Sequence, residues 1–450
     1  MSASRAPALS VAGLLSVDEA RDRILAAITG PLSAERLTPL AALGRVVAEP
    51  VVASTSLPPW DNAAMDGYAV RAADTTTATE AEPARLTVIG EVRAGVAPDR
   101  TVEPGTAVRI ATGAPIPPGA DAVVPVELTT PLNERDRPGP RERDAGGPLP
   151  SACLVHEKVQ SGASIRRAGS DLLAGSVVLD RGAVVTAPAV SLAAGAGATS
   201  VAVHRRPRVG VLATGDEIRE PGEALGAAGI PDANRPGLLA HVAAAGAEPV
   251  DLGIARDQLD DVLGWLRDGL AQGVDALIVS GGVSVGPYDV VKAAFEAIGR
   301  IDLWRVAVQP GKPFVFGTAE RPGGEAPVLL FGLPGNPVST VVTFELFVRP
   351  ALRRLAGHAR PFRPRDRAVL GEPVTKSQGR RAFLRVVAAR DDAGDVERDD
   401  RGRVCVRLAG GQGSHVLSAL GAADALAVIP ESNDSLPAGA EVELWWFDPA

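Results

Sequence analysis

Acidic side chains recur beside Gly-, Pro- and Asn-rich turns along this chain. The segment LPPWDNAAMDGYAV, residues 57–70, carries Asp61 and Asp66 among residues that break regular structure. Three further acids each follow an apolar run: Glu217, Asp257 and Asp289. If these three converge at one sheet edge, they form an oxygen-only cluster, which suits Mg²⁺ because that ion prefers carboxylates, water and ligand phosphates. Taken alone, Glu217 or Asp257 is better explained as a solvated loop residue.

Gly-rich turns follow three apolar runs, RVGVLATGDE (208–217), ALIVSGGVSVGPYD (276–289) and PVLLFGLPGNPVST (327–340). In the second turn, Gly281 and Gly282 allow a ligand to approach the backbone, while Ser280 and Ser284 offer hydroxyl groups. A purely structural turn would not need the carboxylate of Asp289, so we interpret this turn as a ligand site. It matches neither the G-x-G-x-x-G fingerprint nor the Walker phosphate loop.

The third turn leads into a helix. Gly335 permits a tight backbone, Asn336 is a favourable N-cap, and Pro337 fits the first helical position. The free N–H groups of such a helix point at the sheet edge and can bind an anion. A helix that is merely well capped explains the motif equally well.

Cationic side chains flank a Pro–Gly–Lys–Pro turn in WRVAVQPGKPFVFG, residues 304–317. Arg305 and Lys312, around this stiff turn, are candidates for clamping a phosphate or another oxyanion. The five histidines lack ligand spacing, and the two cysteines, Cys153 and Cys405, are too few for a thiolate metal site or a disulfide framework. The sequence therefore argues against a zinc enzyme.

Strand–helix alternation over residues 206–355 predicts an α/β domain with a mainly parallel sheet. Ligands of such sheets bind beyond the carboxyl ends of the strands, where the Gly-rich turns would gather. Residues 53–171 predict a β-rich module in which the nearly neutral stretch 133–150 is a mobile insertion. Short strands over residues 356–450 predict a small C-terminal β domain. The fold class is thus multidomain α/β plus β.

The N-terminal residues 14–52 are predicted to be helical. Ser16 and Glu19 form a capping box for one helix, and residues 37–54 predict a second short helix leading into an extended run. We expect this segment to pack with residues 172–205 as a linking domain.

Composition limits the function classes. A chain of 450 residues predicts two to four domains. The net charge of −8 argues against nucleic-acid binding, which needs a basic face. No run approaches the roughly 18 apolar residues of a membrane helix, and the N-terminus lacks a signal-peptide cleavage site. We therefore expect a cytoplasmic protein.

Nine short motifs occur here in an order typical of one family: DNAAMDGYAV, ATGAPIP, IRRAGSD, TGDE, GIARD, SGGVSVGPYD, PGKP, GLPGNPVS and GQGSHVL. On these motifs the chain resembles the molybdopterin molybdotransferase family, which includes the C-terminal domain of gephyrin. The similarity runs from Ser16 to the C-terminus, interrupted mainly at 133–150. It implies an elongated homodimer whose subunits combine a β-rich module, a molybdopterin-binding α/β domain and a C-terminal β-barrel-like domain.

The resemblance also implies a reaction. With Mg²⁺, members insert molybdate into adenylylated molybdopterin and release AMP, at a site between the α/β domain of one subunit and the β-rich module of the other. Contacts with the adenylyltransferase and with recipient molybdoenzymes are further expectations. A scaffold that binds molybdopterin without turnover and a tungstate-preferring paralogue are the alternatives.

Site residues carry over by motif. The expected catalytic residues are Asp66, Thr112, Asp171, Glu217, Asp257 and Lys312. The expected substrate-binding residues are Ser280, Gly281, Gly282, Ser284, Arg305, Pro334, Asn336, Pro337 and Ser414. The expected metal ligands are Asp66, Asp257 and Asp289. Trp60, Met65 and Tyr68 are expected to anchor the loop that carries Asp66, while Asp61 is expected to be a structural turn residue. Arg305 and Gln309 stand where the bacterial family pattern has lysines, so the oxyanion pocket departs from that pattern.

Overall fold

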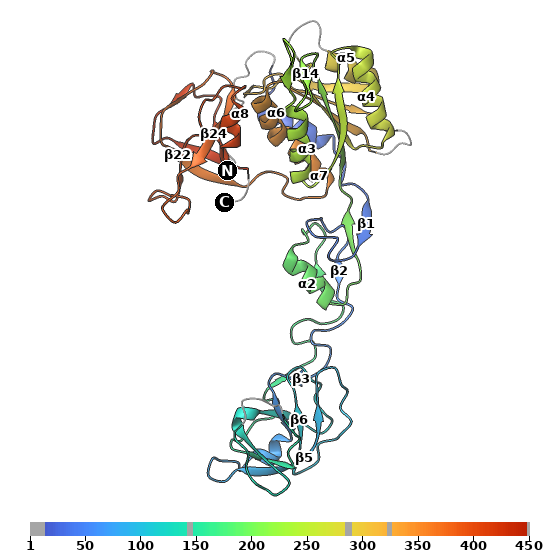
Figure 1. Ribbon diagram of the computed structural model, residues 1–450, viewed down its shortest axis with the longest axis vertical. Coiled ribbons are helices and arrows are strands. Elements are labelled where there is room, and N and C mark those ends of the chain that lie inside the picture. The colour runs from blue at the N-terminus through green and yellow to red at the C-terminus, as the bar shows by residue number, and fades with distance from the viewer. Residues whose placement is uncertain (1–13, 142–146, 284–289, 322–325, 448–450) are drawn as a thin grey trace, which may run out of the picture.

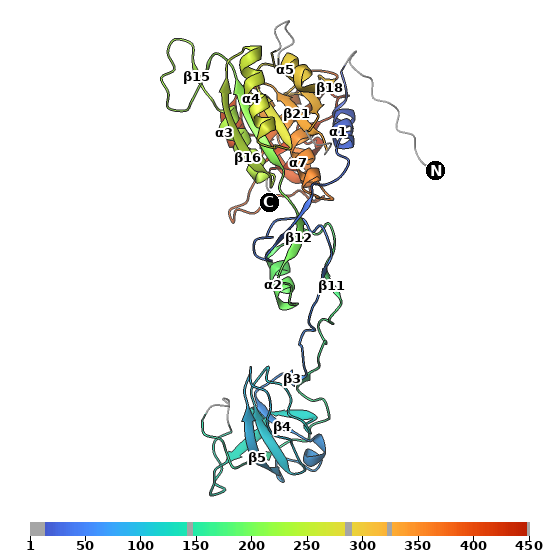
Figure 2. The same cartoon turned by 90° about the vertical axis from the view of Figure 1, so that its right-hand side faces the viewer.

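The computed structural model describes residues 14–141, 147–283, 290–321 and 326–447 and shows an elongated subunit (Figure 1). A β-rich module lies at one end, and the α/β domain and the C-terminal domain lie side by side at the other. A narrow linking part joins the two ends, as both views show (Figures 1 and 2). The predicted elongated multidomain arrangement is confirmed.

The α/β domain is built on a six-stranded sheet. In spatial order its strands are β16 (Glu248–Ala255), β13 (Arg208–Thr214), β17 (Ala276–Ser280), β21 (Val328–Leu333), β20 (Val315–Ala319) and β18 (Gly299–Trp304). The first four run parallel to one another, whereas β20 runs antiparallel to both of its neighbours. The mainly parallel sheet predicted from the alternating pattern is therefore confirmed.

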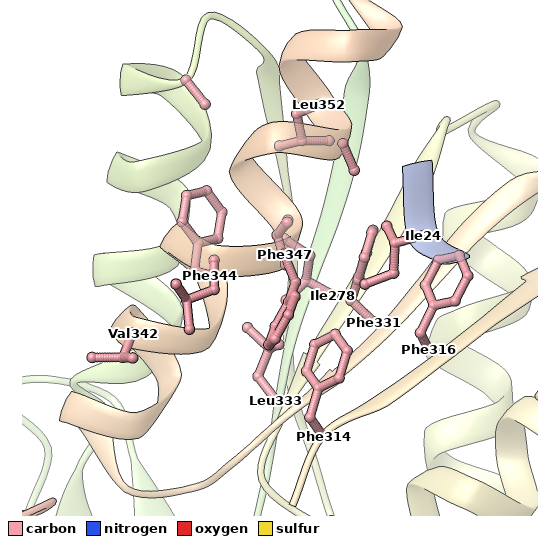
Figure 3. Close-up of a cluster of buried hydrophobic side chains, with 14 of the residues drawn as sticks. Ile24, Ile278, Phe314, Phe316, Phe331, Leu333, Val342, Phe344, Phe347 and Leu352 are labelled. Carbon is pink, nitrogen blue, oxygen red and sulfur yellow. The ribbon is translucent and has the colours of Figure 1, made fainter. Parts of the chain in front are cut away.

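Helices cover both faces of this sheet. One face carries α3 (Asn234–Ala244), α6 (Pro337–Thr343), a π-helical turn (Phe344–Val348) and α7 (Arg349–Leu355), and the other carries α4 (Leu259–Ala271) and α5 (Val290–Ile298). Phe347 projects from the helical layer toward Phe314, whereas Phe344 points toward α3, where its ring centroid lies 5.3 Å from that of His241 (Figure 3). The Phe314 and Phe347 rings lie 4.6 Å apart between their centroids, and both side chains are fully buried. Burying a side chain of this size contributes about 1.5–3 kcal/mol.

Helix α1 (Val17–Ala26) packs on the α/β domain, which corrects our prediction that it joins residues 172–205. The predicted capping box is present, because Ser16 N–H donates to the Glu19 carboxylate at 2.9 Å and Ser16 Oγ accepts from Glu19 N–H at 3.2 Å. The buried Ile24 belongs to the core of Figure 3. The apolar face of α1 thus meets α7 and the π-helical turn.

The second predicted helix is also wrong. After β1 (Ala34–Leu37), residues 39–44 form turns, since Pro39 and the positive φ of Gly44 (76°) leave too few residues for a helix. β1 pairs with β12 (Val201–His204), and β2 (Val51–Val52) pairs with β11 (Val177–Leu179). With α2 (Ala187–Gly195), these outgoing and returning segments share a small core and form the linking part.

The β-rich module contains a six-stranded sheet. Its spatial order is β7 (Ala122–Pro125), β4 (Gly67–Val70), β6 (Thr106–Ile110), β5 (Ala84–Val92), β9 (Ala152–Val155) and β8 (Thr129–Leu132). The buried Arg109 donates to the carbonyls of Gly147 at 3.1 Å and Pro148 at 3.3 Å. One end of the 133–150 insertion is therefore held against this sheet, while residues 142–146 lie outside the described chain.

The C-terminal domain is a closed barrel, as predicted. Its five strands are β24 (Arg381–Ala388), β25 (Val404–Leu408), β22 (Arg365–Leu370), β28 (Glu441–Trp446) and β26 (Ala425–Ile429). The pairing of β26 with β24 closes the barrel. The remaining elements are η1 (Ala72–Thr75), η2 (Val126–Leu128), β3 (Asn62–Ala63), β10 (Ile165–Arg166), β14 (Ile218–Arg219), β15 (Ile230–Pro231), β19 (Val308–Gln309), β23 (Val374–Thr375), β27 (Ser435–Leu436) and α8 (Leu417–Gly421). Across the described ranges, none of the helices has the length and apolar character that crossing a membrane requires.

Candidate functional site

The three Gly-rich turns meet at one edge of the α/β sheet. They follow β13, β17 and β21, which are consecutive in the sheet, so their carboxyl ends lie together. Gly281 has a φ of +98°, and a Cβ there would lie 2.2 Å from the Thr214 carbonyl oxygen. A Cβ on Gly335 would lie 3.8 Å from the Gly281 Cα. Glycine is therefore required at 281, and backbone atoms of all three turns form one continuous surface.

Asp257 lies at the same edge, just beyond β16. Its carboxylate accepts a hydrogen bond from the buried Thr214 hydroxyl at 2.6 Å. Its own N–H points at the carboxylate of Asp216, at 3.4 Å. Asp216 and Glu217 are both exposed, and Asp216, not the Glu217 that we singled out, has its carboxylate beside the Asp257 N–H. The sequence could not decide between two adjacent acids because the turn geometry sets which of them faces the neighbouring strand.

Ser280 and Pro334 belong to the inner layer of the site. The buried Ser280 hydroxyl lies 3.4 Å from the Pro334 carbonyl, and Gly281 N–H donates to the carbonyl of Leu333 at 3.2 Å. These contacts hold the second turn against the third. Gly282, with a φ of +63°, packs against the side of Thr214. The predicted residues Ser284 and Asp289 lie outside the described chain.

The third turn starts α6 as the sequence predicts. Asn336 is the N-cap residue and Pro337 occupies the first turn, but the Asn336 side chain makes no capping bond to the described residues. Thr340 instead donates its hydroxyl to the carbonyls of Pro334 and Asn336. The Asn336 side chain is exposed at this edge of the sheet.

Two cations belong to the neighbouring segment: Lys312 lies in the Pro–Gly–Lys–Pro turn, and Arg305 lies upstream of it. Arg305 has a φ of +73°, a left-handed conformation that costs a non-Gly residue about 1–3 kcal/mol. Its Nε is shielded from solvent and has no hydrogen-bond partner within the described part of the chain. Lys312 is partly buried, and its carbonyl accepts from Val306 N–H at 3.3 Å. A guanidinium that is incompletely paired is suited to binding an oxyanion.

Two of the hydrogen bonds between the C-terminal barrel and the α/β domain involve residues named in the sequence analysis. Val338 N–H, in the first turn of α6, donates to the Ser414 carbonyl at 3.2 Å. Gln309 Oε1 accepts from Ser377 N–H at 3.0 Å. The first contact places Ser414 at the edge of the Gly-rich turns. The second shows that Gln309, which stands where we expected a lysine, joins the α/β domain to the barrel.

The remaining predicted residues lie on loops of the β-rich module. Asp66 accepts from Thr112 through its backbone N–H at 2.6 Å and its hydroxyl at 2.7 Å, and both residues are exposed. Asp171 is exposed on the adjoining loop, where its N–H donates to the Leu57 carbonyl at 3.0 Å. The module therefore presents a preorganised carboxylate with no role in its own core.

Asp61 holds the same loop in place. Its carboxylate accepts from Ala168 N–H at 2.8 Å and from Arg167 at 2.6 Å. These hydrogen bonds lower the pKa of Asp61, and the one from Ala168 has the larger effect. Of the three residues expected to anchor the loop, Tyr68 is buried, whereas Trp60 is 50% exposed and Met65 is 42% exposed. Those two large apolar side chains lie uncovered on the segment that carries Asp66.

Asp66 and Asp257 lie at opposite ends of one subunit. The β-rich module and the α/β domain are separated by the linking part in both views (Figures 1 and 2). Consistent with that separation, the described residues contain no group of three or more His, Cys, Asp or Glu side chains that could hold a metal ion. The donors at hand are carboxylate oxygens, which are the ligands that suit Mg²⁺. A three-carboxylate site would need further ligands beyond the described part of one chain.

The chain matches family descriptions along most of its length. Residues 15–197 match "MoeA N-terminal region (domain I and II)", residues 210–354 match "Probable molybdopterin binding domain", and residues 367–447 match "MoeA C-terminal region (domain IV)". The three Gly-rich turns and Asp257 all fall within the second match.

Curated relatives cover nearly the whole chain. It is 38% identical to molybdopterin molybdenumtransferase 2 of Mycobacterium tuberculosis, over 90% of this chain and 93% of that protein. It is 34% identical to the molybdopterin molybdenumtransferase of Haemophilus influenzae, over 97% of this chain and 99% of that protein. A crystal structure of a molybdopterin biosynthesis MoeA protein from Pyrococcus horikoshii superposes with a TM-score of 0.77 at 29% identity, covering 97% of this chain and 100% of that one.

Proposed function

Because the chain belongs to the MoeA family of molybdopterin molybdenumtransferases, we propose that it inserts molybdate into adenylylated molybdopterin and releases AMP. This step belongs to molybdenum cofactor biosynthesis. The proposal is carried by one observation, the meeting of three backbone-exposing turns with Asp257 at a single sheet edge. An edge of this kind accepts a long anionic ligand, since glycine lets phosphates approach backbone N–H groups.

Cations and hydroxyls would orient the two anions. Lys312 and the incompletely paired Arg305 would bind molybdate or the pyrophosphate oxygens, and Ser414 would line the same edge from the barrel. Their charge matters because the whole protein has a net charge of −8 and repels anions at long range. Holding both anions against fixed donors lowers the barrier by orientation and by stabilising the charge that develops on the leaving phosphate.

A divalent cation is part of the proposal. Asp257 and Asp66 would hold Mg²⁺, together with Asp289. When bound, Mg²⁺ would offset the negative charge of the phosphate groups. The Thr112 contacts fix the Asp66 carboxylate, and the Thr214 hydroxyl fixes that of Asp257, so both acids are positioned before substrate binds. Asp171 and Glu217 would complete the polar lining.

A homodimer would bring the separated halves together. Large apolar side chains are exposed over the linking part: Leu40 (73%), Val177 (52%), Val52 (49%), Leu43 (46%) and Val184 (41%). Exposed apolar clusters of this kind are typical of protein interfaces. Pairing two copies through the linking part would place the Asp66 loop of one subunit at the Gly-rich turns of the other, covering Trp60 and Met65. The expected contacts with an adenylyltransferase and with recipient enzymes, and the cytoplasmic location, stay predictions.

The test is AMP release. Purified protein supplied with adenylylated molybdopterin, molybdate and Mg²⁺ should release AMP, and omission of molybdate or chelation of the metal should stop it. Asp66→Asn and Asp257→Asn should each abolish turnover with an unchanged unfolding temperature. Tight substrate binding without AMP release would instead support a non-catalytic scaffold, and faster turnover with tungstate would support a different oxyanion.

A further inference from the structure

Asn234 is a polar residue at the Gly-rich turns that no motif of the sequence analysis includes. It is the first residue of α3, where Asp232 Oδ1 accepts from Asn234 N–H at 3.0 Å and from Arg235 N–H at 3.0 Å. Asp232 therefore accepts hydrogen bonds from N–H groups that would otherwise be unpaired at the start of the helix. The Asn234 side chain is not needed for capping and is directed elsewhere.

The amide nitrogen of Asn234 holds the third turn. Nδ2 donates to the Gly335 carbonyl at 2.7 Å. Gly335 is the residue whose Cβ position lies 3.8 Å from Gly281. Asn234 thus connects α3 with the place where two Gly-rich turns approach each other. The contact also fixes the orientation of the amide, because only its nitrogen can donate to a carbonyl.

The amide oxygen of Asn234 takes no part in these contacts. Oδ1 is shielded from solvent and accepts no hydrogen bond from the residues that the structure describes. A buried acceptor without a partner destabilises a fold, and such atoms are uncommon in native proteins. An amide oxygen has no proton to give, so it cannot recognise molybdate, phosphate or carboxylate oxygens. Its partner must carry an N–H or O–H group.

We infer that Asn234 Oδ1 accepts a hydrogen bond from the ring amino group of the substrate. This inference rests on the proposed function. The substrate joins two fused nitrogen heterocycles, an adenine with a 6-amino group and a pterin with a 2-amino group, and either supplies the same chemistry. Asn234 is then both a positioning residue for the third turn and a specificity residue for the ring.

Two ligand pairs test the inference on the full-length protein by calorimetry. AMP is compared with purine riboside 5′-monophosphate, which lacks the 6-amino group, and 6-hydroxymethylpterin is compared with 6-hydroxymethyllumazine, which carries oxygen in place of the 2-amino group. The wild type should bind the amino member of one pair about 3- to 10-fold more tightly. The pair that shows this preference identifies the ring.

Variants separate the two roles of Asn234. Asn234→Ala should abolish the amino preference. Asn234→Asp keeps an acceptor oxygen and loses the donor to Gly335, so it should keep the preference while lowering kcat. Unfolding temperatures control for folding. Equal affinities in both pairs for the wild type, or a preference that persists in Asn234→Ala, would overturn the inference. AMP release by the wild type is measured separately. The inference can therefore fail while the proposed function stands, and the proposed function can fail while the amino preference is observed.

Discussion

Gly335→Ala separates a ligand contact from a folding defect. Gly335 lacks a left-handed φ, and the only neighbour of an added Cβ among the described residues is the Gly281 Cα at 3.8 Å, an ordinary van der Waals distance. The free protein should therefore tolerate the methyl group. Restricting the unfolded chain should leave the free energy of unfolding unchanged or raise it by up to about 1 kcal/mol. The methyl group would, however, occupy the surface that the Gly-rich turns offer to the ligand.

The expected kinetic effect is large. Displacing a bound pyrophosphate by a fraction of an ångström should lower kcat/KM at least about tenfold, equivalent to about 1.4 kcal/mol of transition-state stabilisation. The matched control is Gly237→Ala on α3, where an added Cβ meets no described atom within 4 Å. AMP release and urea unfolding would be measured for both variants. If Gly335→Ala keeps full kcat/KM with unchanged stability, no ligand lies against this turn and the reasoning is refuted.

Three further predictions test other parts of the structure. Thr214→Val removes the hydroxyl that holds Asp257 and should lower kcat at least about tenfold, whereas Thr214→Ser should retain activity; equal losses would contradict a role for the hydroxyl. Burial, and then the charges of Arg353 and Arg349, lower the pKa of His358 from 6.5 to about 4, so the unfolded chain binds the extra proton and the free energy of unfolding should rise with pH between those values. In urea titrations, His358→Gln should flatten the rise of the unfolding free energy with pH. If wild type and variant rise with the same slope, the rise does not come from His358. Leu40→Glu, at a side chain 73% exposed, should yield a folded monomer by light scattering, and an unchanged dimer would exclude this surface as the interface.

Much of the fold was predictable because its patterns are local. The apolar runs before TGDE, SGGVS and GLPGNP became β13, β17 and β21, and parallel topology then gathered their carboxyl ends. Asp257 was placed at the edge by the same logic. The prediction that failed was the choice of the domain against which α1 packs. The amphipathic pattern of α1 shows that one face is buried, but it holds no information on which domain provides the partner.

Other features of the site depend on tertiary contacts. Asn234 and Gly335 are far apart in sequence, so their hydrogen bond could not be anticipated without the packing of α3 against α6. The left-handed backbone of Arg305 is equally invisible, because arginine rarely adopts it. The exposure of Trp60 reverses the usual tendency of large aromatic side chains to be covered, and pairing with a second subunit would explain it.

Subunit mixing tests the central claim most directly, namely that one active site takes Asp66 from one subunit and Asp257 from the other. Asp66→Asn and Asp257→Asn chains, each inactive alone, would be unfolded together, refolded and assayed for AMP release. Random pairing in a symmetric dimer gives half mixed dimers with one intact site each, so about a quarter of wild-type activity should return. If the mixture stays as inactive as its components, the two carboxylates do not act in one shared site and the account is wrong.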